Sequence, residues 1–170
     1  HKIEVLKGDA SVVAPGRVMV GEEEIHAKAV IIASGGRPAH IPGLDFNGTT
    51  VIGAKEALEQ TDLPERIGVI GAGALGAEFA CAWNAFGAKV TLVELMPHVL
   101  PKEDTELGDM LEGCLKKLGM DVRTGTSVSK LTHEADGTIT LELTGKKPGE
   151  IKVDKVLVSR MAAADDEDRT

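Results

Sequence analysis

The chain has 170 residues, which is enough for one ordinary domain or two small ones, and 42% of them are apolar. The net charge is −8 and aromatic residues make up only 2%. This composition argues against a nucleic-acid-binding protein, which needs a basic stripe or an aromatic stacking platform. It also gives no sign of a membrane protein, because the apolar run at 29–33 has only the length of a strand.

The first 36 residues are expected to form short strands. Strand patterns separated by glycines and by a Pro-Gly turn lie at 3–6, 11–13, 17–20 and 24–26. The run Ala29-Val-Ile-Ile-Ala33 is continuous and rich in β-branched residues, which is typical of a strand buried on both faces. Residues 37–66 contain prolines, glycines and a short helix pattern at 54–60, and we expect them to be a linker.

From residue 67 the predicted order is strand, helix, strand, helix, strand. Apolar strands at 67–70 and 89–93 flank a helix that ends at Gly87. The apolar face of that helix is expected to consist of residues at helical spacing, namely Leu75, Phe79, Trp83 and Phe86. A second helix pattern begins near Leu107 and ends at Gly119.

Short strand patterns complete the chain. They lie at 120–123, 127–131, 138–143, 151–153 and 156–158. Asp136-Gly137 predicts a hairpin turn between two of them. We therefore predict an α/β fold for residues 67–158, a Rossmann-like parallel sheet with an antiparallel β-meander. The acidic residues 159–170 are expected to be a disordered tail.

The strongest motif is Gly71-Ala-Gly-Ala-Leu-Gly76, which follows a predicted buried strand and opens a predicted helix. Gly71 allows the sharp turn, Gly73 leaves room for a diphosphate, and Gly76 lets the helix pack closely on the strand. The first N–H groups of the helix have no partners within it and favour an anion. The motif predicts a dinucleotide site, although a tight turn with no ligand has the same pattern.

Glu94 ends the second strand, close to the spacing of ~20 residues at which a dinucleotide fold places a carboxylate. Such a carboxylate accepts hydrogen bonds from the adenosine ribose of NAD. It disfavours NADP, because a 2′-phosphate about 4 Å away meets a repulsion of about 4 kcal/mol. The residues after it, Leu95-Met-Pro-His98, lack the arginine that usually accommodates this phosphate. The alternative is that Glu94 is a solvated strand end.

Three further residues are less specific. Glu78, in the second turn of the first helix, is either an exposed carboxylate or a neighbour of the nicotinamide ribose and amide. Cys81 and Cys114 fit neither a disulfide framework nor a zinc site. We expect them to be buried thiols in a reducing cytoplasm. We predict no metal site and no catalytic residue in the chain.

The motifs and their order resemble the dihydrolipoamide dehydrogenase family, within the pyridine nucleotide–disulfide oxidoreductases. The resemblance covers roughly residues 3–159. Its matching segments are Gly8-Asp-Ala10, Val30-Ile-Ile-Ala-Ser-Gly-Gly-Arg-Pro38, Ile41-Pro-Gly-Leu44, Glu56-Ala-Leu58, Pro64-Glu-Arg-Ile-Gly-Val-Ile-Gly-Ala-Gly73 and Val90-Thr-Leu-Val-Glu94. It implies an FAD/NAD(P)-binding fold in which residues 1–36 are a β-rich fragment of the FAD domain and 67–158 are the NAD-binding domain.

The resemblance also implies binding residues. FAD in the parent enzyme would lie near Gly8 and Ser34-Gly35-Gly36. The residues implied to line the NAD site are Gly71, Ala72, Gly73, Ala74, Leu75, Gly76, Ala77, Glu78, Glu94 and Val128. The family often has a bulky gating residue where this chain has Ala74.

The parent enzyme implied by the resemblance is a homodimer of a 2-oxo acid dehydrogenase complex. It oxidises the dihydrolipoyl group of an acyltransferase and passes electrons through a cysteine pair and FAD to NAD. That pair and the FAD fingerprint would lie upstream of His1, and a catalytic His–Glu pair downstream of Thr170, so we expect this chain alone to be inactive. After Ser159 the sequence departs from the family's pattern and loses a glycine expected to touch NAD.

Two other functions remain possible at this point. One is a sister enzyme such as mercuric or glutathione reductase, and the other is a non-catalytic nucleotide-binding module. Neither nucleic acid nor a membrane is expected as a partner.

Overall fold

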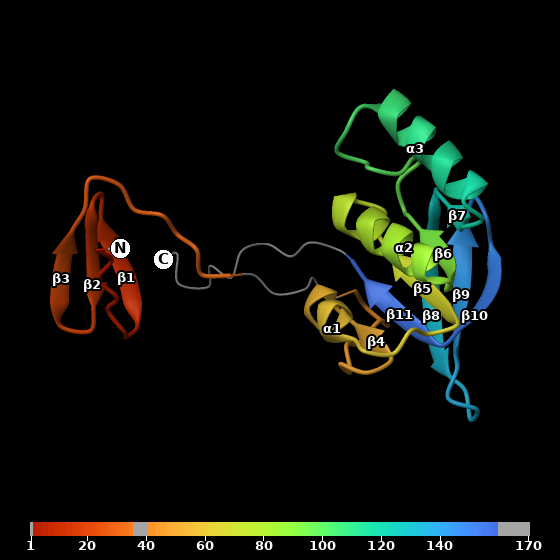
Figure 1. Cartoon of the computed structure of the whole chain (residues 1–170), viewed down its shortest axis with the longest axis horizontal. Helices are drawn as coiled ribbons and strands as arrows, with labels where there is room; N and C mark the ends of the chain where they lie inside the picture. Colours follow the sequence, from red (N-terminus) through yellow and green to blue (C-terminus); the bar gives the residue numbers. More distant parts are fainter. Residues whose placement is uncertain (1, 36–40, 160–170) are drawn as a thin grey trace. The chain divides into compact units, whose positions relative to one another are not determined.

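The computed structural model describes residues 2–35 and 41–159, which belong to two compact units that divide between residues 37 and 38. The smaller unit contains a three-stranded antiparallel sheet (Figure 1). Its strands, in sheet order, are β1 (Ala10–Ala14), β2 (Arg17–Val20) and β3 (Glu23–His26). These agree with the strands predicted at 11–13, 17–20 and 24–26.

Two other strands expected in the smaller unit do not form. Residues 3–6 and 29–33 make no strand, and Ile31 is 89% exposed. The strand predicted at Ala29–Ala33 therefore does not form, and the burial on both faces that its pattern indicates is not realised in this chain. A buried strand needs hydrogen-bonding neighbours and an apolar layer on each face, and within residues 2–35 the segment has neither.

The larger unit is built on a five-stranded parallel sheet in the order β4-β11-β5-β6-β7. The strands are β4 (Val51–Ile52), β5 (Arg66–Ile70), β6 (Lys89–Val93), β7 (Asp121–Arg123) and β11 (Lys155–Val158). The Rossmann-like parallel sheet predicted for residues 67–158 is confirmed.

The segment expected to be a linker contributes to this sheet. Its strand β4 pairs in parallel with β11, and Val51 and Ile52 are almost completely buried. The predicted short helix follows as α1 (Ala54–Glu59). Prolines and glycines gave the segment the composition of a linker, but two apolar residues were enough to add a strand at the sheet edge.

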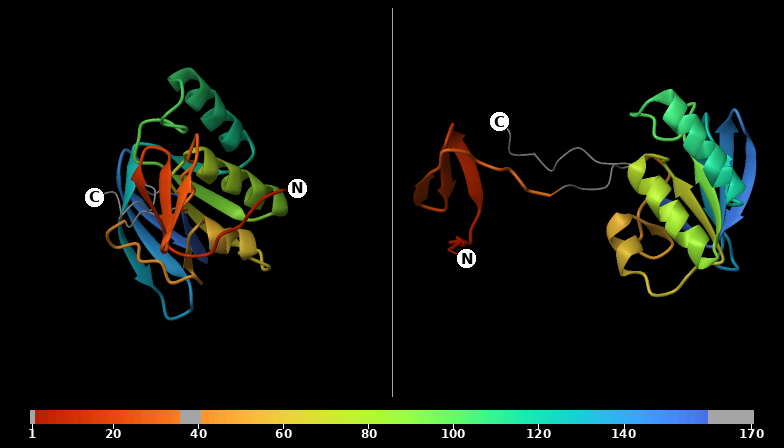
Figure 2. Two further views of the ribbon diagram at one scale, coloured as in Figure 1. Left: turned by 90° about the vertical axis from the view of Figure 1, so that its left-hand side faces the viewer. Right: turned by 45° about the horizontal axis from the view of Figure 1, so that its top comes forward.

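Helices cover one face of the parallel sheet and an antiparallel meander covers the other, as the two views in Figure 2 show. The helices are α2 (Ala74–Phe86) and α3 (Thr105–Lys117). The meander consists of β8 (Thr126–His133), β9 (Ile139–Gly145) and β10 (Gly149–Val153). Side chains alternate along each strand, so Val69 packs in the core beneath the helices while Ile70 packs against the meander.

Small residues rather than aromatic ones form most of the face of α2 that packs on the sheet. Its buried residues are Gly76, Ala77, Ala80 and Trp83. Phe86, expected on that face, is 72% exposed. A Cβ at Gly76 would lie 1.9 Å from the Gly71 carbonyl oxygen, so the helix begins too close to the preceding turn for any side chain there. Gly87 ends the helix in a left-handed conformation, as predicted.

Candidate functional site

The candidate site begins where β5 turns into α2. Gly71 has a φ of +102°, a conformation that L residues rarely adopt, and its N–H donates to the Val93 carbonyl at 2.8 Å. Gly73 is the N-cap of α2, and no side chain caps the helix. A Cβ at Gly73 would meet nothing within 4 Å. The start of α2 therefore has open space before it and N–H groups that can bind an anion.

Glu94 holds this turn in place. The residue is only 7% exposed. Its Oε2 accepts a hydrogen bond from the Ala72 N–H at 2.6 Å, and its Oε1 accepts one from the Met96 N–H at 2.9 Å. A carboxylate has about four acceptor positions, so each oxygen can accept a further hydrogen bond from a ligand hydroxyl. Glu94 thus joins the end of β6 to the glycine turn while it faces the cavity described below.

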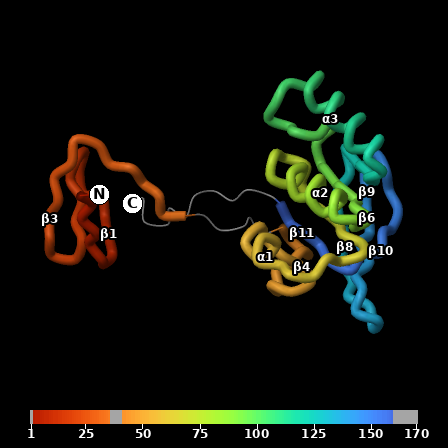
Figure 3. Tube along the Cα trace, in the orientation of Figure 1, coloured from red at the N-terminus to blue at the C-terminus, as the bar shows by residue number. Residues whose placement is uncertain are grey.

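The loop between β6 and α3 lies beside the same turn, as the trace in Figure 3 shows. The Leu100 N–H donates to the Ala72 carbonyl at 2.8 Å, and the Gly125 N–H donates to the Met96 carbonyl at 2.8 Å. Leu100 has a φ of +52°, which is uncommon for a residue with a side chain. Two main-chain hydrogen bonds therefore fix this loop against the turn on one side and the start of β8 on the other.

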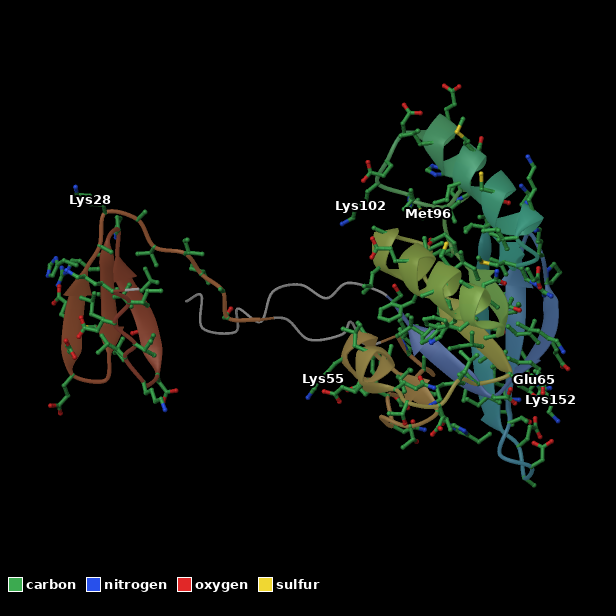
Figure 4. All side chains as sticks on the ribbon, in the orientation of Figure 1. Lys28, Lys55, Glu65, Met96, Lys102 and Lys152 are labelled. Atoms are coloured by element: carbon green, nitrogen blue, oxygen red, sulfur yellow. The ribbon has the colours of Figure 1, made fainter. Side chains whose placement is uncertain are left out.

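A cavity of about 670 Å³ opens at this end of the sheet. Its volume is within the usual range for sites of small molecules and cofactors. It is lined by the glycine turn, the end of β6, the loop that follows it, the first residues of β8 and Ser159 after β11. Among the described residues of that lining, Lys102 is the only one with a positively charged side chain, and Figure 4 shows it with Met96 on the loop.

The cavity brings together most of the residues predicted to line an NAD site. Those that line it are Gly71, Gly73, Ala74, Leu75, Glu94 and Val128. Ala72, Gly76 and Ala77 are buried and do not line it. Glu78 is exposed on α2 and is also absent from the lining. Its contact with the nicotinamide half of the ligand remains a prediction.

Sequence reasoning missed several residues of the cavity. Met96, Leu100 and Lys102 come from the loop after β6, whose sequence carries no recognisable motif. Ile41 and Leu44 come from the segment expected to be a linker. The long segment between the second predicted strand and the second predicted helix was the one available signal for a loop, and its length alone does not identify a ligand site.

The residues implied for FAD lie in the smaller unit. Gly8, Ser34 and Gly35 are exposed there, and Gly36 lies outside the described residues. Of the tail expected at 159–170, residues 160–170 also lie outside them, whereas Ser159 is described and buried, so the expected tail does not begin at that residue. The structure of the smaller unit thus leaves the FAD contacts as predictions.

The prediction of two buried thiols is wrong. Cys81 is half-buried and Cys114 is exposed, because α3 buries Gly108 and Leu115 and leaves Cys114 on its outer side. Within residues 2–35 and 41–159 no three His, Cys, Asp or Glu side chains are placed to hold a metal ion. None of the helices in this part of the chain is long and apolar enough to cross a membrane.

Comparison with known proteins gives a consistent family. The sequence model of the family described as "Pyridine nucleotide-disulphide oxidoreductase" matches residues 1–165. The chain is 38% identical over 162 residues to the dihydrolipoyl dehydrogenase of Thermus scotoductus, covering 94% of this chain and 35% of that protein. It is 35% identical over 164 residues to that of Chlorobaculum parvum, covering 93% of this chain and 35% of the relative. The chain therefore spans about a third of the length of these relatives.

Solved structures show a similar fold. The HOCl-induced flavoprotein disulfide reductase RclA from Escherichia coli matches with a TM-score of 0.68 and 26% identity, covering 91% of this chain and 35% of that one. The water-forming NADH oxidase from Lactobacillus brevis, bound to NADH, matches with a TM-score of 0.65 and 26% identity. The match covers 89% of this chain and 36% of that one.

Proposed function

Because the chain belongs to the pyridine nucleotide-disulphide oxidoreductase family, we propose that its larger unit is the NAD-binding portion of a dihydrolipoamide dehydrogenase. One observation carries the proposal: the glycine turn, the uncapped start of α2 and the buried carboxylate of Glu94 meet at one cavity. The names of the relatives from Thermus scotoductus and Chlorobaculum parvum support the choice of enzyme.

The residues fit a dinucleotide. The space in front of Gly73 and the free N–H groups at the start of α2 suit a diphosphate, which needs hydrogen-bond donors and no side chain in its way. The open acceptor positions of Glu94 suit the hydroxyls of the adenosine ribose. The same negative charge disfavours the 2′-phosphate of NADP.

The parent reaction in this proposal is the oxidation of the dihydrolipoyl group of an acyltransferase by a homodimeric, cytoplasmic enzyme. NAD, when bound, supplies the hydride acceptor, and the residues of this chain hold and orient the NAD. FAD of the parent enzyme is proposed to lie near Gly8, Ser34, Gly35 and Gly36. The 170-residue chain alone is expected to be inactive, since its two cysteines lie on different helices and cannot replace a redox-active pair.

Titration of the 170-residue chain with NADH and NADPH, followed by nucleotide fluorescence, tests the nucleotide site. We expect NADH to bind more tightly than NADPH. Glu94→Gln should weaken NADH binding about 5- to 10-fold, because it removes a charge-assisted hydrogen bond, and it should reduce the discrimination against NADPH. Glu65→Gln is the matched control, because Glu65 is exposed before β5, beside Lys89 and outside the cavity (Figure 4).

The outcomes separate the possible functions. Absence of NADH binding would contradict the proposed site. Tighter binding of NADPH would instead favour a sister reductase of the mercuric or glutathione type. Formation of NADH from NAD and dihydrolipoamide by the purified 170-residue chain would show that our expectation of inactivity is wrong.

A further inference from the structure

Ser159 follows β11 directly and contributes to the lining of the cavity. The residue is only 7% exposed. Its N–H donates to the Ile70 carbonyl at 2.8 Å, which holds it beside the end of β5, where the glycine turn begins. Its hydroxyl is buried and has no hydrogen-bond partner among the described residues.

Burying a hydroxyl without a hydrogen-bond partner is unfavourable, so the presence of one at the lining of a cavity needs a reason. A Cβ placed at Gly76 would lie 3.0 Å from Ser159 Oγ, so the hydroxyl lies against the first turn of α2. Because Ser159 lines the cavity, rotation about its Cα–Cβ bond to another staggered position can direct Oγ towards a bound molecule.

The strand order indicates which part of a ligand Ser159 meets. Strands β6 and β11 flank β5 on opposite sides. Glu94 follows β6, whereas Ser159 follows β11. Ligands of such sheets lie across the carboxyl ends of the strands at the point where the strand order reverses. A dinucleotide whose adenosine ribose lies at Glu94 therefore extends across the glycine turn towards Ser159.

We propose that the Ser159 hydroxyl forms a hydrogen bond to the nicotinamide half of a bound dinucleotide, which lies on the other side of the diphosphate from the adenosine. This inference rests on the proposed function and adds a residue that selects a full dinucleotide over a shorter adenine nucleotide.

The test compares NADH with ADP, which ends at the diphosphate, in titrations of the 170-residue chain. Ser159→Ala should weaken NADH binding about 5- to 10-fold, corresponding to the loss of one hydrogen bond of about 1 kcal/mol. ADP binding should stay unchanged, because ADP does not reach the end of β11. Ser129→Ala is the matched control, since the Ser129 hydroxyl donates to the Glu142 carbonyl in the meander and lies outside the cavity.

The possible results of these titrations distinguish a failure of the inference about Ser159 from a failure of the proposed function. Unchanged NADH binding by the Ser159→Ala variant would overturn the inference, and so would an equal loss of NADH and ADP binding, which would mean that the turn itself is disturbed. If the unmodified chain bound neither nucleotide, the proposed function would fail first. If it bound both and only the NADH affinity fell in the variant, the inference would be supported.

Discussion

Two apolar runs of the chain have similar sequence patterns, but one forms a buried strand and the other is exposed. Ala29–Ala33 and Ile67–Ile70 both have the pattern of a strand buried on both faces. The second forms most of β5, in which Ile67 and Val69 are completely buried. The first forms no strand, and its Ile31 is 89% exposed.

This difference shows that an apolar pattern indicates only that a segment can be buried. Whether the segment is buried depends on the segments that lie next to it. Strand β5 is hydrogen-bonded to β11 on one side and to β6 on the other. It also has helices on one face and the meander on the other. The larger unit contains all the partners of its apolar strand, while residues 2–35 contain none for Ala29–Ala33.

Hydrogen exchange should show the largest contrast between the two runs. We expect the amides of Ile67–Ile70 to exchange at least about 10³-fold more slowly than unfolded amides, because only global unfolding exposes a central strand. The amides of residues 29–33 should exchange close to the unprotected rate. Strong protection of residues 29–33 in a monomer would contradict this comparison, whereas protection that increases with concentration would mean that the segment pairs with another chain.

The same substitution in the two runs should also have different effects on stability. Ile67→Ala removes a completely buried side chain and should lower the free energy of unfolding by about 2–5 kcal/mol. Ile31→Ala should change it by less than about 0.5 kcal/mol. Urea unfolding measures both, with the fluorescence of the single tryptophan, Trp83, reporting on the larger unit and circular dichroism on the whole chain. Equal losses in the two variants would show that residues 29–33 are buried in solution.

Gly76 tests the close packing within the larger unit. Gly76→Ala would place a Cβ against the Gly71 carbonyl oxygen, and we expect a destabilisation of about 1–3 kcal/mol together with weaker NADH binding. Gly113→Ala in α3 is the matched control, because a Cβ there meets nothing within 4 Å. That substitution should stabilise the helix by about 0.5–1 kcal/mol. A neutral effect of Gly76→Ala would indicate that the turn can move away from the helix.

The strand–turn–helix of the larger unit could be predicted from sequence because its signals are local. Gly71, Gly73 and Gly76 have fixed positions between an apolar strand and an amphipathic helix, and each structural role expected of them agrees with the geometry. The hairpin at Asp136-Gly137 was predictable for the same reason, since the Glu134 N–H donates to the Thr138 carbonyl across it.

Features that depend on distant residues could not be predicted in this way. The burial of β4 depends on its pairing with β11, about a hundred residues later in the chain. The second role of Glu94, as acceptor for the Ala72 N–H, depends on a contact between two turns. The unpartnered hydroxyl of Ser159 becomes recognisable only once the cavity has been located.

The two units also contain arginine–carboxylate pairs that differ in exposure, and these give the smallest predicted effect. In the larger unit the Asp154 carboxylate accepts hydrogen bonds from the Arg66 N–H at 2.8 Å and from the Arg66 guanidinium, and this arginine lowers the pKa of Asp154. In the smaller unit Arg17 lowers the pKa of Glu24 across a more exposed pair.

A carboxylate whose pKa is lower in the folded than in the unfolded chain stabilises the fold above its unfolded pKa, and this contribution is lost as the pH falls through the folded pKa. Asp154→Ala should therefore lower the free energy of unfolding of the larger unit by about 1 kcal/mol at pH 7. The difference from the unmodified chain should begin to shrink below pH ~4, the usual pKa of a free Asp, and disappear as the pH falls through the lower folded pKa of Asp154. Glu24→Ala is the matched control, and Trp83 fluorescence should show no change for it. If both variants shifted the Trp83 transition equally, the two units would not unfold independently. The difference in stability expected between the two units would then be contradicted.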